Sequence, residues 1–300
     1  MFEGINIIEF VSRFNDNDSC YSYLMEKKWG NGFSCSYCGC AQSVKGRTWY
    51  YKRCRQCKYD ESVTANTVFH GMKIPVLKAF HLTFRLAAKK KGMSTVELGH
   101  EVGVQQKTAW LFKRRVQEIL SDNKKLKTAV EADETIVGGH RSGKEHRGRS
   151  LKSKSAVVVA REVLEDGRTG NINFKVTENF EVDTLKYVLS DMIESGASIL
   201  TDKHKSYESL KGELNIKTVL SDKGSSLEEL HKQIMLFKNW LRGIHHKCSK
   251  ELLQKYLDEY KFRFNLRNCR KKIFDVLISK IMQYEPQPYL KLKCTCECNT

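Results

Sequence analysis

The sequence lacks the features of a protein that crosses a membrane or is secreted. No apolar run reaches the ~20 residues that a bilayer-spanning helix needs. The opening residues "MFEGINIIEF" place Glu3 and Glu9 where a secretory signal would carry basic side chains. We therefore expect a cytoplasmic protein with no membrane partner.

Acidic residues are scarce relative to basic ones. The 300-residue chain contains 52 Lys and Arg but only 35 Asp and Glu, which gives a net charge of +17. Such an excess favours a polyanionic partner, and nucleic acid is the natural candidate once a membrane is excluded. The length is sufficient for one large core together with a smaller module.

A disulfide framework is not expected, because the eleven cysteines are an odd number and paired spacings in a reducing cytosol favour metal binding. Two C-x-x-C pairs, "CSYC" and "CRQC", have fifteen residues between them. This spacing lets the four thiolates of Cys35, Cys38, Cys54 and Cys57 converge on one tetrahedral zinc ion. A redox pair of the thioredoxin type would need a βαβ context that is missing here. The pattern predicts a structural zinc ribbon.

The remaining cysteines give weaker signals. Cys40, two residues after Cys38, is interpreted as a bystander, although it could compete for the zinc. The "CTCEC" segment with Cys294, Cys296 and Cys298 resembles a metal clamp, but terminal tails are usually disordered. We assign no metal site to it.

A helical module is predicted after the ribbon. Residues 74–92 have apolar positions at helical spacing with Pro75 near the start, and residues 93–120 read as two helices broken at Gly103. A short helix, a glycine turn and a basic second helix predict a helix-turn-helix, whose second helix would enter a DNA major groove. The alternative is a basic, solvated helix that packs on the next domain. The candidate DNA contacts are Gln105, Gln106, Lys107, Lys113, Arg114 and Arg115.

From Thr128 onward the pattern changes to strands. "TAVEADETIVGG", "KSAVVVAREV" and "NINFKVTENF" predict a three-stranded meander, with Gly167 and Gly170 in the second turn. A helix over 183–196, a strand at 198–202 and a strand at 216–221 follow. The resulting order, β-β-β-α-β-α-β-α, predicts an α/β domain of the ribonuclease H-like class.

Two aspartates stand out within these strands. Asp133 lies in the middle of the first strand, where Asp is disfavoured, and Asp202 ends the strand "SILTD". A single strand-end Asp is usually a cap or turn residue. Neighbouring central strands would, however, bring both carboxylates together, and a hard cation such as Mg²⁺ would offset their repulsion.

A basic segment, "GGHRSGKEHRGRSLKSK", joins the first two predicted strands. Next to a phosphate-processing site it would bind DNA, and Arg141 and Arg147 are its candidate contacts. Its alternative is a solvated run of charges.

Several motifs in fixed order resemble the IS1595 insertion-sequence transposases, in particular the ISXO2-like group. They are "KWGNGFSCSYCG", "TVFHGMKIP", "VEADETIVGG", "RGRSLKSK", "LTDKHKSY", "LHKQIMLFKNWLRGIHHKCS" and "LLQKYLDEYKFRFNLR". The resemblance runs from about Cys20 to Leu277. It implies a zinc ribbon, a helix-turn-helix and a ribonuclease H-like catalytic domain of the DDE class, acting in a prokaryotic, nucleoid-associated setting.

The resemblance also implies the catalytic residues. The first acid falls on Asp133, the second on Asp202, the third position of the triad on His231, and the accompanying lysine on Lys238. His231 and Lys238 are two helical turns apart, so both project from one face of a helix. A histidine is a departure from three carboxylates, and imidazole suits Mn²⁺ better than Mg²⁺.

Three glutamates are alternatives for the third ligand. Glu228 and Glu229 lie near His231 in the sequence and would compensate for a weak ligand. Glu259 is a further candidate, although pairing with Arg263 one helical turn later is an equally good interpretation.

The implied activity is the binding of transposon ends followed by metal-dependent cleavage and strand transfer. The DNA partners would be the terminal inverted repeats and the target duplex, bound by a homo-oligomer. We expect helices and ribbon over 1–72, the helix-turn-helix over 73–127, the catalytic domain over 128–285 and a tail over 286–300. The alternatives are a domesticated metal-dependent nuclease and a DNA-binding regulator without catalysis.

Overall fold

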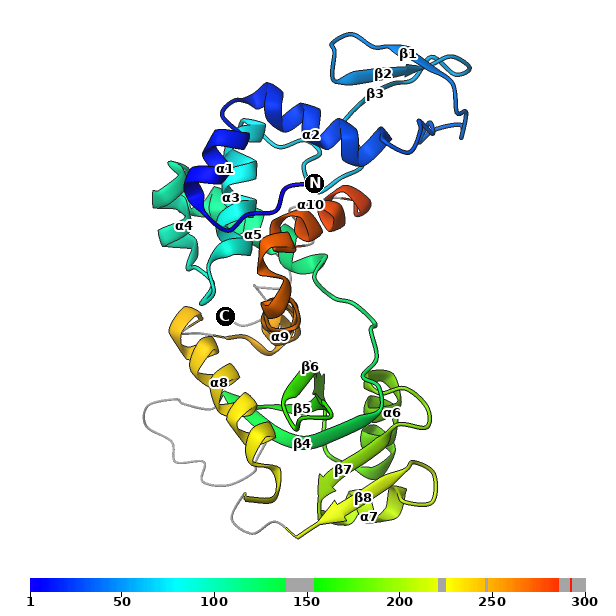
Figure 1. The fold of residues 1–300 in the computed structure, drawn as a ribbon, viewed down its shortest axis with the longest axis vertical. Coiled ribbons are helices and arrows are strands. Elements are labelled where there is room, and N and C mark those ends of the chain that lie inside the picture. Colours follow the sequence, from blue (N-terminus) through cyan, green and yellow to red (C-terminus); the bar gives the residue numbers. More distant parts are fainter. Residues whose placement is uncertain (139–153, 221–224, 246–247, 286–291, 293–300) are drawn as a thin grey trace. The chain divides into compact units, whose positions relative to one another are not determined.

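The computed structural model describes residues 1–138, 154–220, 225–245, 248–285 and 292, and the chain forms two compact units (Figure 1). Residues 1–119 and 268–285 form the first unit, and the described residues of 120–267 form the second. No helix in the described ranges is long and apolar enough to cross a membrane.

The first unit begins with two helices and a small antiparallel sheet of order β1-β2-β3. Asp16 caps α2 in a reciprocal capping box with Ser19. Lys28 of α2 forms a 2.7 Å ion pair with the buried Glu61 of β3, which joins the helix to the sheet. The bounds are α1 Ile7–Arg13, α2 Asn17–Trp29, β1 Ser43–Lys45, β2 Tyr51–Cys54 and β3 Asp60–Ser62.

Four further helices complete this unit. Gly103 ends α4 in the left-handed conformation (φ 65°), which permits the sharp turn into α5. Ser94 caps α4 by accepting a 3.2 Å hydrogen bond from the Glu97 amide. The bounds are α3 Val76–Ala88, α4 Thr95–Val102, α5 Gln106–Glu118 and α10 Ile273–Gln283.

The C-terminal helix α10 belongs to the first unit, whereas the sequence pattern had extended the catalytic domain to residue 285. Its Phe274 is fully buried and packs edge-on against Phe2, Phe10 and Phe80. The neighbouring Asp275 forms a 2.6 Å ion pair with Lys27 of α2. These contacts join residues between 194 (274 − 80) and 272 (274 − 2) positions apart, so a local sequence pattern could not predict them.

The second unit is built on a five-stranded sheet of order β6-β5-β4-β7-β8. The strands β6, β5 and β4 are antiparallel neighbours, and β4-β7 and β7-β8 are parallel. This order confirms the predicted ribonuclease H-like arrangement in a mixed α/β unit. The bounds are β4 Ala129–Gly138, β5 Lys154–Val163, β6 Thr169–Thr177, α6 Val182–Met192, β7 Ser198–Asp202, α7 Lys205–Leu210, β8 Ile216–Val219, η1 Ser225–Leu227, α8 Glu228–Ile244 and α9 Lys250–Asn265. The short helix η2, Arg267–Lys272, follows at the boundary and lies almost entirely in the first unit.

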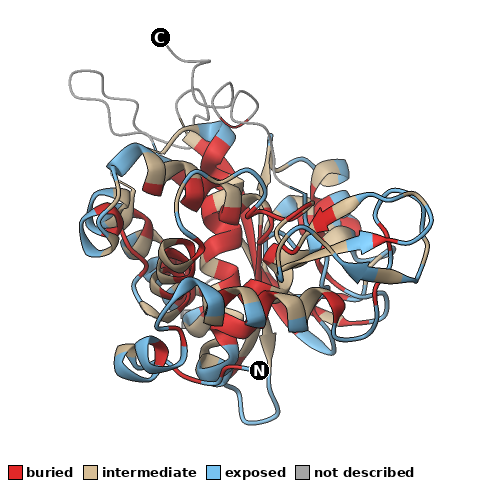
Figure 2. Cartoon of the chain, turned by 90° about the horizontal axis from the view of Figure 1, so that it is seen from above, coloured by how far each residue is buried: buried red, intermediate tan, exposed pale blue. Residues whose placement is uncertain are grey.

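Both faces of the sheet are covered. Alternate residues of the central strand β5 enter two different cores: Val158 packs with α6 and α7, and Val159 packs with α8 and α9. This explains why the sequence "SAVVVA" is continuously apolar. Figure 2 shows the buried segments in red along the strands and the inner sides of the helices.

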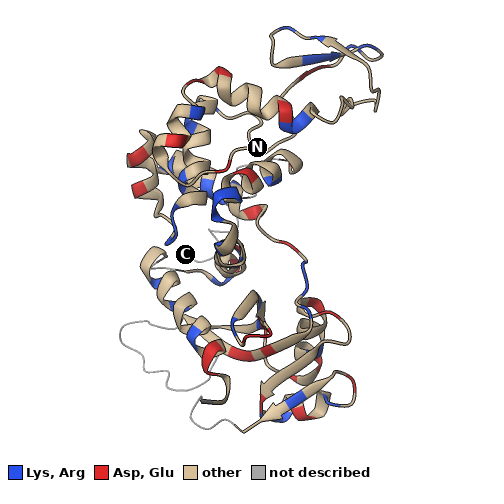
Figure 3. Ribbon diagram, viewed as in Figure 1, with Lys and Arg blue, Asp and Glu red and all other residues tan. Residues whose placement is uncertain are grey.

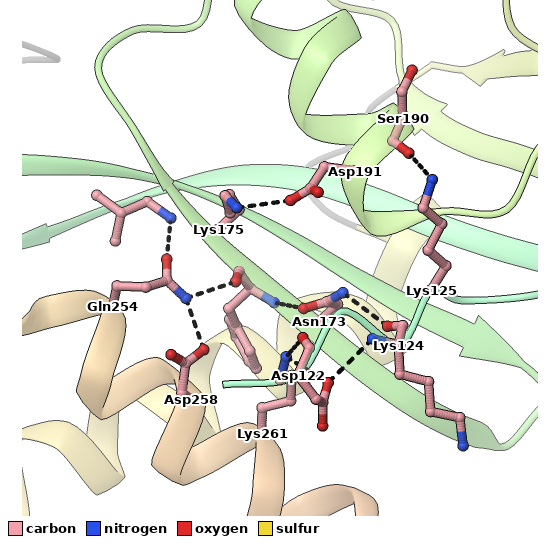
Figure 4. Close-up of polar contacts among 12 residues, drawn as sticks. Asp122, Lys124, Lys125, Asn173, Lys175, Ser190, Asp191, Gln254, Asp258 and Lys261 are labelled. Atoms are coloured by element: carbon pink, nitrogen blue, oxygen red, sulfur yellow. Dashed lines mark hydrogen bonds and ion pairs between the residues drawn. The ribbon is translucent and has the colours of Figure 1, made fainter. Parts of the chain in front are cut away.

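Polar contacts fasten α9 to the edge strand β6 (Figure 4). Gln254 accepts from the Val176 amide at 2.8 Å and donates to the Phe174 carbonyl at 3.2 Å. Lys261, also on α9, forms a 3.0 Å ion pair with Asp122 at the start of the unit. Backbone groups at the free edge of β6 are therefore hydrogen-bonded by side chains rather than by another strand.

Candidate active site and metal centres

The candidate active site lies where β4 and β7 stop pairing. Their parallel pairing covers three residue pairs and ends at Glu131 and Leu200, although β4 continues to Gly138 and β7 to Asp202. Asp133 and Asp202 come after the last pair and line a pocket of about 320 Å³. The structure thus brings together the two aspartates that the strand order placed side by side.

A third carboxylate joins them. Ligand atoms of Asp133, Glu134 and Asp202 all lie within 4.8 Å of one another. Figure 3 shows the acidic residues of β4 in red. The sequence analysis did not select Glu134, because strand alternation sends it to the face opposite Asp133. The only available signal was the adjacent pair of acids in "ADET".

These carboxylates are difficult to ionise together. Burial raises the pKa of Asp133, and the nearby Asp202 adds to this effect. Burial, followed by the charge of Asp133, raises the pKa of Glu134 to about 7. Burial also raises the pKa of Tyr207 well above its ordinary value, with the Glu134 carboxylate as the next cause. The site is therefore short of positive charge.

Lys238 of α8 lines this pocket, and His231 of the same helix contacts Asp133. The helix buries Leu230, Ile234 and Phe237 against the sheet, which fixes the residues beside them at the pocket. The His231 Nε2 atom lies 3.1 Å from Asp133 Oδ2. His231 is not among the three residues whose ligand atoms are mutually close.

Lys238 lines the same pocket as the acids. Burial, together with the charge of Arg242, lowers the pKa of Lys238, and Asp133 opposes that shift. Phe180 and His204 also line the pocket and were not selected from the sequence. His204 follows Asp202 by two residues, so proximity in "TDKH" was the signal.

The three glutamates considered as alternatives for the third metal ligand lie outside the acidic group. Glu228 and Glu229 both form ion pairs with Lys232, at 3.0 and 2.8 Å, and neither belongs to the acidic group. Glu259 is buried and forms a 2.9 Å ion pair with Arg263. The structural interpretation of Glu259 therefore agrees with its contacts.

A second candidate metal centre lies in the first unit. Ligand atoms of Cys35, Cys38, Cys54 and Cys57 all lie within 4.8 Å of one another. Cys35 and Cys57 approach to 3.6 Å, and Cys38 and Cys54 to 3.5 Å. Cys40 is outside this group, and its carbonyl accepts from the Cys35 amide. Four convergent thiolates fit a closed, tetrahedral zinc site.

The predicted DNA contacts divide into two groups by exposure. Gln105, Gln106 and Lys107 are exposed at the start of α5. Lys113 and Arg114 are each only 3% exposed. Lys113 donates a 2.9 Å hydrogen bond to the Met93 carbonyl, and Arg114 pairs with Glu118 at 3.1 Å. Lys113 and Arg114 therefore have structural partners, which corrects their selection as DNA contacts.

Arg115 is intermediate in exposure, and burial lowers its pKa. Arg141 and Arg147 lie outside the described residues. The cysteines at 294, 296 and 298 also lie outside them.

Two family models match the chain. Residues 125–265 match an ISXO2-like transposase domain, and residues 15–60 match a transposase zinc-ribbon domain. The first match contains the acidic pocket, and the second contains the four clustered cysteines. No curated protein sequence matches the chain.

Solved structures that resemble the chain include a pre-cleavage Mos1 transpososome, at 13% identity, 63% coverage of this chain, 74% of the other and a TM-score of 0.29. A Mos1 transposase paired-end complex with the left transposon end has 14% identity, 72% and 82% coverage and a TM-score of 0.31.

Proposed function

Because the chain belongs to the IS1595 family and is a DDE-type DNA transposase, we propose that its acidic pocket performs metal-dependent DNA cleavage and strand transfer. The observation that carries this proposal is the convergence of Asp133, Glu134 and Asp202 in one pocket with Lys238. An acidic cluster alone would repel DNA. With bound cations and a lysine, the same pocket attracts a phosphodiester.

The pocket fits a divalent metal ion. Oxygen atoms of Glu134 and Asp202 are buried without a hydrogen-bond partner among the described residues. Carboxylate oxygens are the ligands that Mg²⁺ and Mn²⁺ prefer. When bound, such ions supply Lewis-acid activation of the attacking oxygen and neutralise charge on the scissile phosphate.

Each catalytic residue has a separate proposed role. Asp133 and Asp202 would hold the divalent cation, and His231, whose Nε2 atom lies 3.1 Å from Asp133 Oδ2, would be a further ligand. Lys238 holds a phosphate next to the scissile bond as a fixed positive charge. No covalent link between protein and DNA is required, since water or a DNA 3′-hydroxyl is the nucleophile.

We assign recognition of the transposon ends to α4 and α5 as a helix-turn-helix. The exposed Gln105, Gln106 and Lys107 lie at the first turn of α5, the part of a recognition helix that contacts base edges. Arg115, Arg141 and Arg147 are further proposed contacts, to the DNA backbone. The ribbon cysteines hold a structural zinc ion, which stabilises the ribbon without taking part in catalysis.

The complete reaction requires two transposon ends to be held together, so we propose a homo-oligomer on DNA. The partners are the terminal inverted repeats and the target duplex, within a prokaryotic cell.

The decisive experiment compares Asp133→Asn and Asp202→Asn with Glu228→Gln, an exposed acid that pairs with Lys232. We expect the two Asn variants to lose cleavage of transposon-end DNA while they retain binding to it. Glu228→Gln should cleave as the parent does. Normal cleavage by either Asn variant would contradict the proposed site.

The same assay distinguishes a domesticated nuclease from a transposase. Pre-cleaved ends with free 3′-hydroxyl groups, incubated with a plasmid target, should yield joined products. A nuclease that has lost strand transfer would cut the ends but would not join them.

A further inference from the structure

Glu134 occupies an unusual position for an acid next to a metal ligand. Successive strand residues point to opposite faces, so Asp133 contacts His231 on the α8 side and Glu134 begins on the α7 side. Their carboxylates nevertheless come within 4.8 Å of each other and of Asp202. They meet where β4 and β7 no longer pair, a place open to side chains from both faces of the sheet.

Within residues 1–138, 154–220, 225–245 and 248–285, no Lys or Arg forms an ion pair with Glu134 or Asp202. Glu134 Oε1 and Asp202 Oδ1 are both buried, and neither has a hydrogen-bond partner in the part of the chain that the structure describes. Burying charged oxygen atoms without partners is costly, so this arrangement is adapted to a group that the protein binds.

A second observation comes from Tyr207 on α7. Its side chain is 0% exposed, and its hydroxyl lies close to the Glu134 carboxyl without making a hydrogen bond of ordinary length and angle within the described residues. Glu134 is the carboxylate with the largest influence on this hydroxyl, followed by Asp133 and Asp202. A buried phenol that faces a carboxylate is a hydrogen-bond donor suited to one oxygen of that carboxylate, which leaves the other oxygen for a cation.

We propose that Glu134 is a third carboxylate ligand of the divalent cation held by Asp133 and Asp202, and that Tyr207 is a positioning residue that orients Glu134. This inference rests on the proposed metal-dependent function. It places Glu134 beside Asp202, while His231 serves Asp133 from the other face. The cation is thereby held by three hard oxygen ligands, which favours Mg²⁺ or Mn²⁺ over softer metals.

The first test measures Mn²⁺ binding to the full-length chain by electron paramagnetic resonance of the free ion. Glu134→Gln keeps the shape of the side chain but removes its charge, and it should weaken Mn²⁺ affinity about tenfold or more. Tyr207→Phe should weaken it by a smaller factor, about two- to fivefold, because it removes only an orienting hydrogen bond. Glu228→Gln, the matched control, should bind Mn²⁺ as the parent does.

The second test measures thermal unfolding with and without Mn²⁺. Without metal, Glu134→Gln should melt at a higher temperature than the parent, because one of three mutually repelling carboxylates is gone. With saturating Mn²⁺ the order should reverse, since the ligand stabilises the parent more. A merely structural glutamate would lower the melting temperature of the variant under both conditions.

The outcomes separate this inference from the function on which it rests. If Asp133→Asn abolishes Mn²⁺ binding while Glu134→Gln binds normally, Glu134 is not a ligand and the proposed active site stands. If Asp133→Asn also binds normally, the metal-dependent function itself is contradicted. Should Glu134→Gln fail to fold, Tyr207→Phe decides: unchanged Mn²⁺ affinity in that variant overturns the role of the pair.

Discussion

In the first unit, the packing of one histidine, His81, depends on its protonation state. His81 of α3 lies edge-on to Phe10, with 5.1 Å between the ring centroids. Burial, with the charge of Arg85 second, lowers the pKa of His81 below 6.5. The folded unit therefore favours the neutral imidazole.

This shift predicts acid sensitivity. As pH falls below about 6.5, the unfolded chain takes up a proton on His81 before the folded chain does, so stability falls with pH. His81→Gln should show a shallower loss of melting temperature between about pH 6.5 and pH 5. His100→Gln, on α4, is the matched control; an equal change in both variants would contradict a specific role for His81.

At the scale of elements, α10 completes an aromatic core that begins at the N-terminus. Phe274→Ala should destabilise the first unit by about 3–5 kcal/mol, because it leaves a cavity among rings that cannot close around it. Tyr284→Ala removes an aromatic ring just after the same helix, where the side chain is 44% exposed, and should have little effect. Urea unfolding followed by tryptophan fluorescence would compare them, and equal stabilities would contradict the assignment of α10.

The zinc ribbon is the other element whose stability can be tested alone. Cys54→Ser should lose zinc, because it removes one of four converging thiolates, and the loss should expose the ribbon to proteolysis. Cys40→Ser provides a control of the same chemistry from outside the cluster. Elemental analysis that finds equal zinc in both variants would show that the ligand set is wrong.

At the scale of the whole molecule, the net charge of +17 should govern DNA affinity. Counterion release predicts that binding to any duplex weakens steeply with salt. Preference for transposon ends should instead depend on the start of α5. Replacing Gln105, Gln106 and Lys107 by Ala should abolish that preference and reduce the salt slope by about one phosphate contact.

Lys211→Ala removes the same charge from a position just after α7 and should leave the preference intact. The measurement is competitive binding of end DNA against random duplex at several salt concentrations. A preference that survives the triple substitution would move recognition away from α5.

The sequence by itself determined the parts that depend on local spacing. The C-x-x-C pairs predicted four clustered thiols, because a metal site of this kind is recognised from a few neighbouring positions. Alternation and turn residues identified the five strands of the second unit, and their order placed Asp133 beside Asp202. The strongly apolar β5 was recognisable because both of its faces are buried.

Only the tertiary structure decided how distant segments share space. Strand alternation assigns Glu134 to the face opposite Asp133, and only the divergence of β4 from β7 brings their carboxylates together. Lys113 reads as a surface base, yet packing buries it against the Met93 carbonyl. Phe274 joins the N-terminal core across the whole chain. A local sequence pattern does not predict burial or long-range contacts, because both depend on the assembled fold.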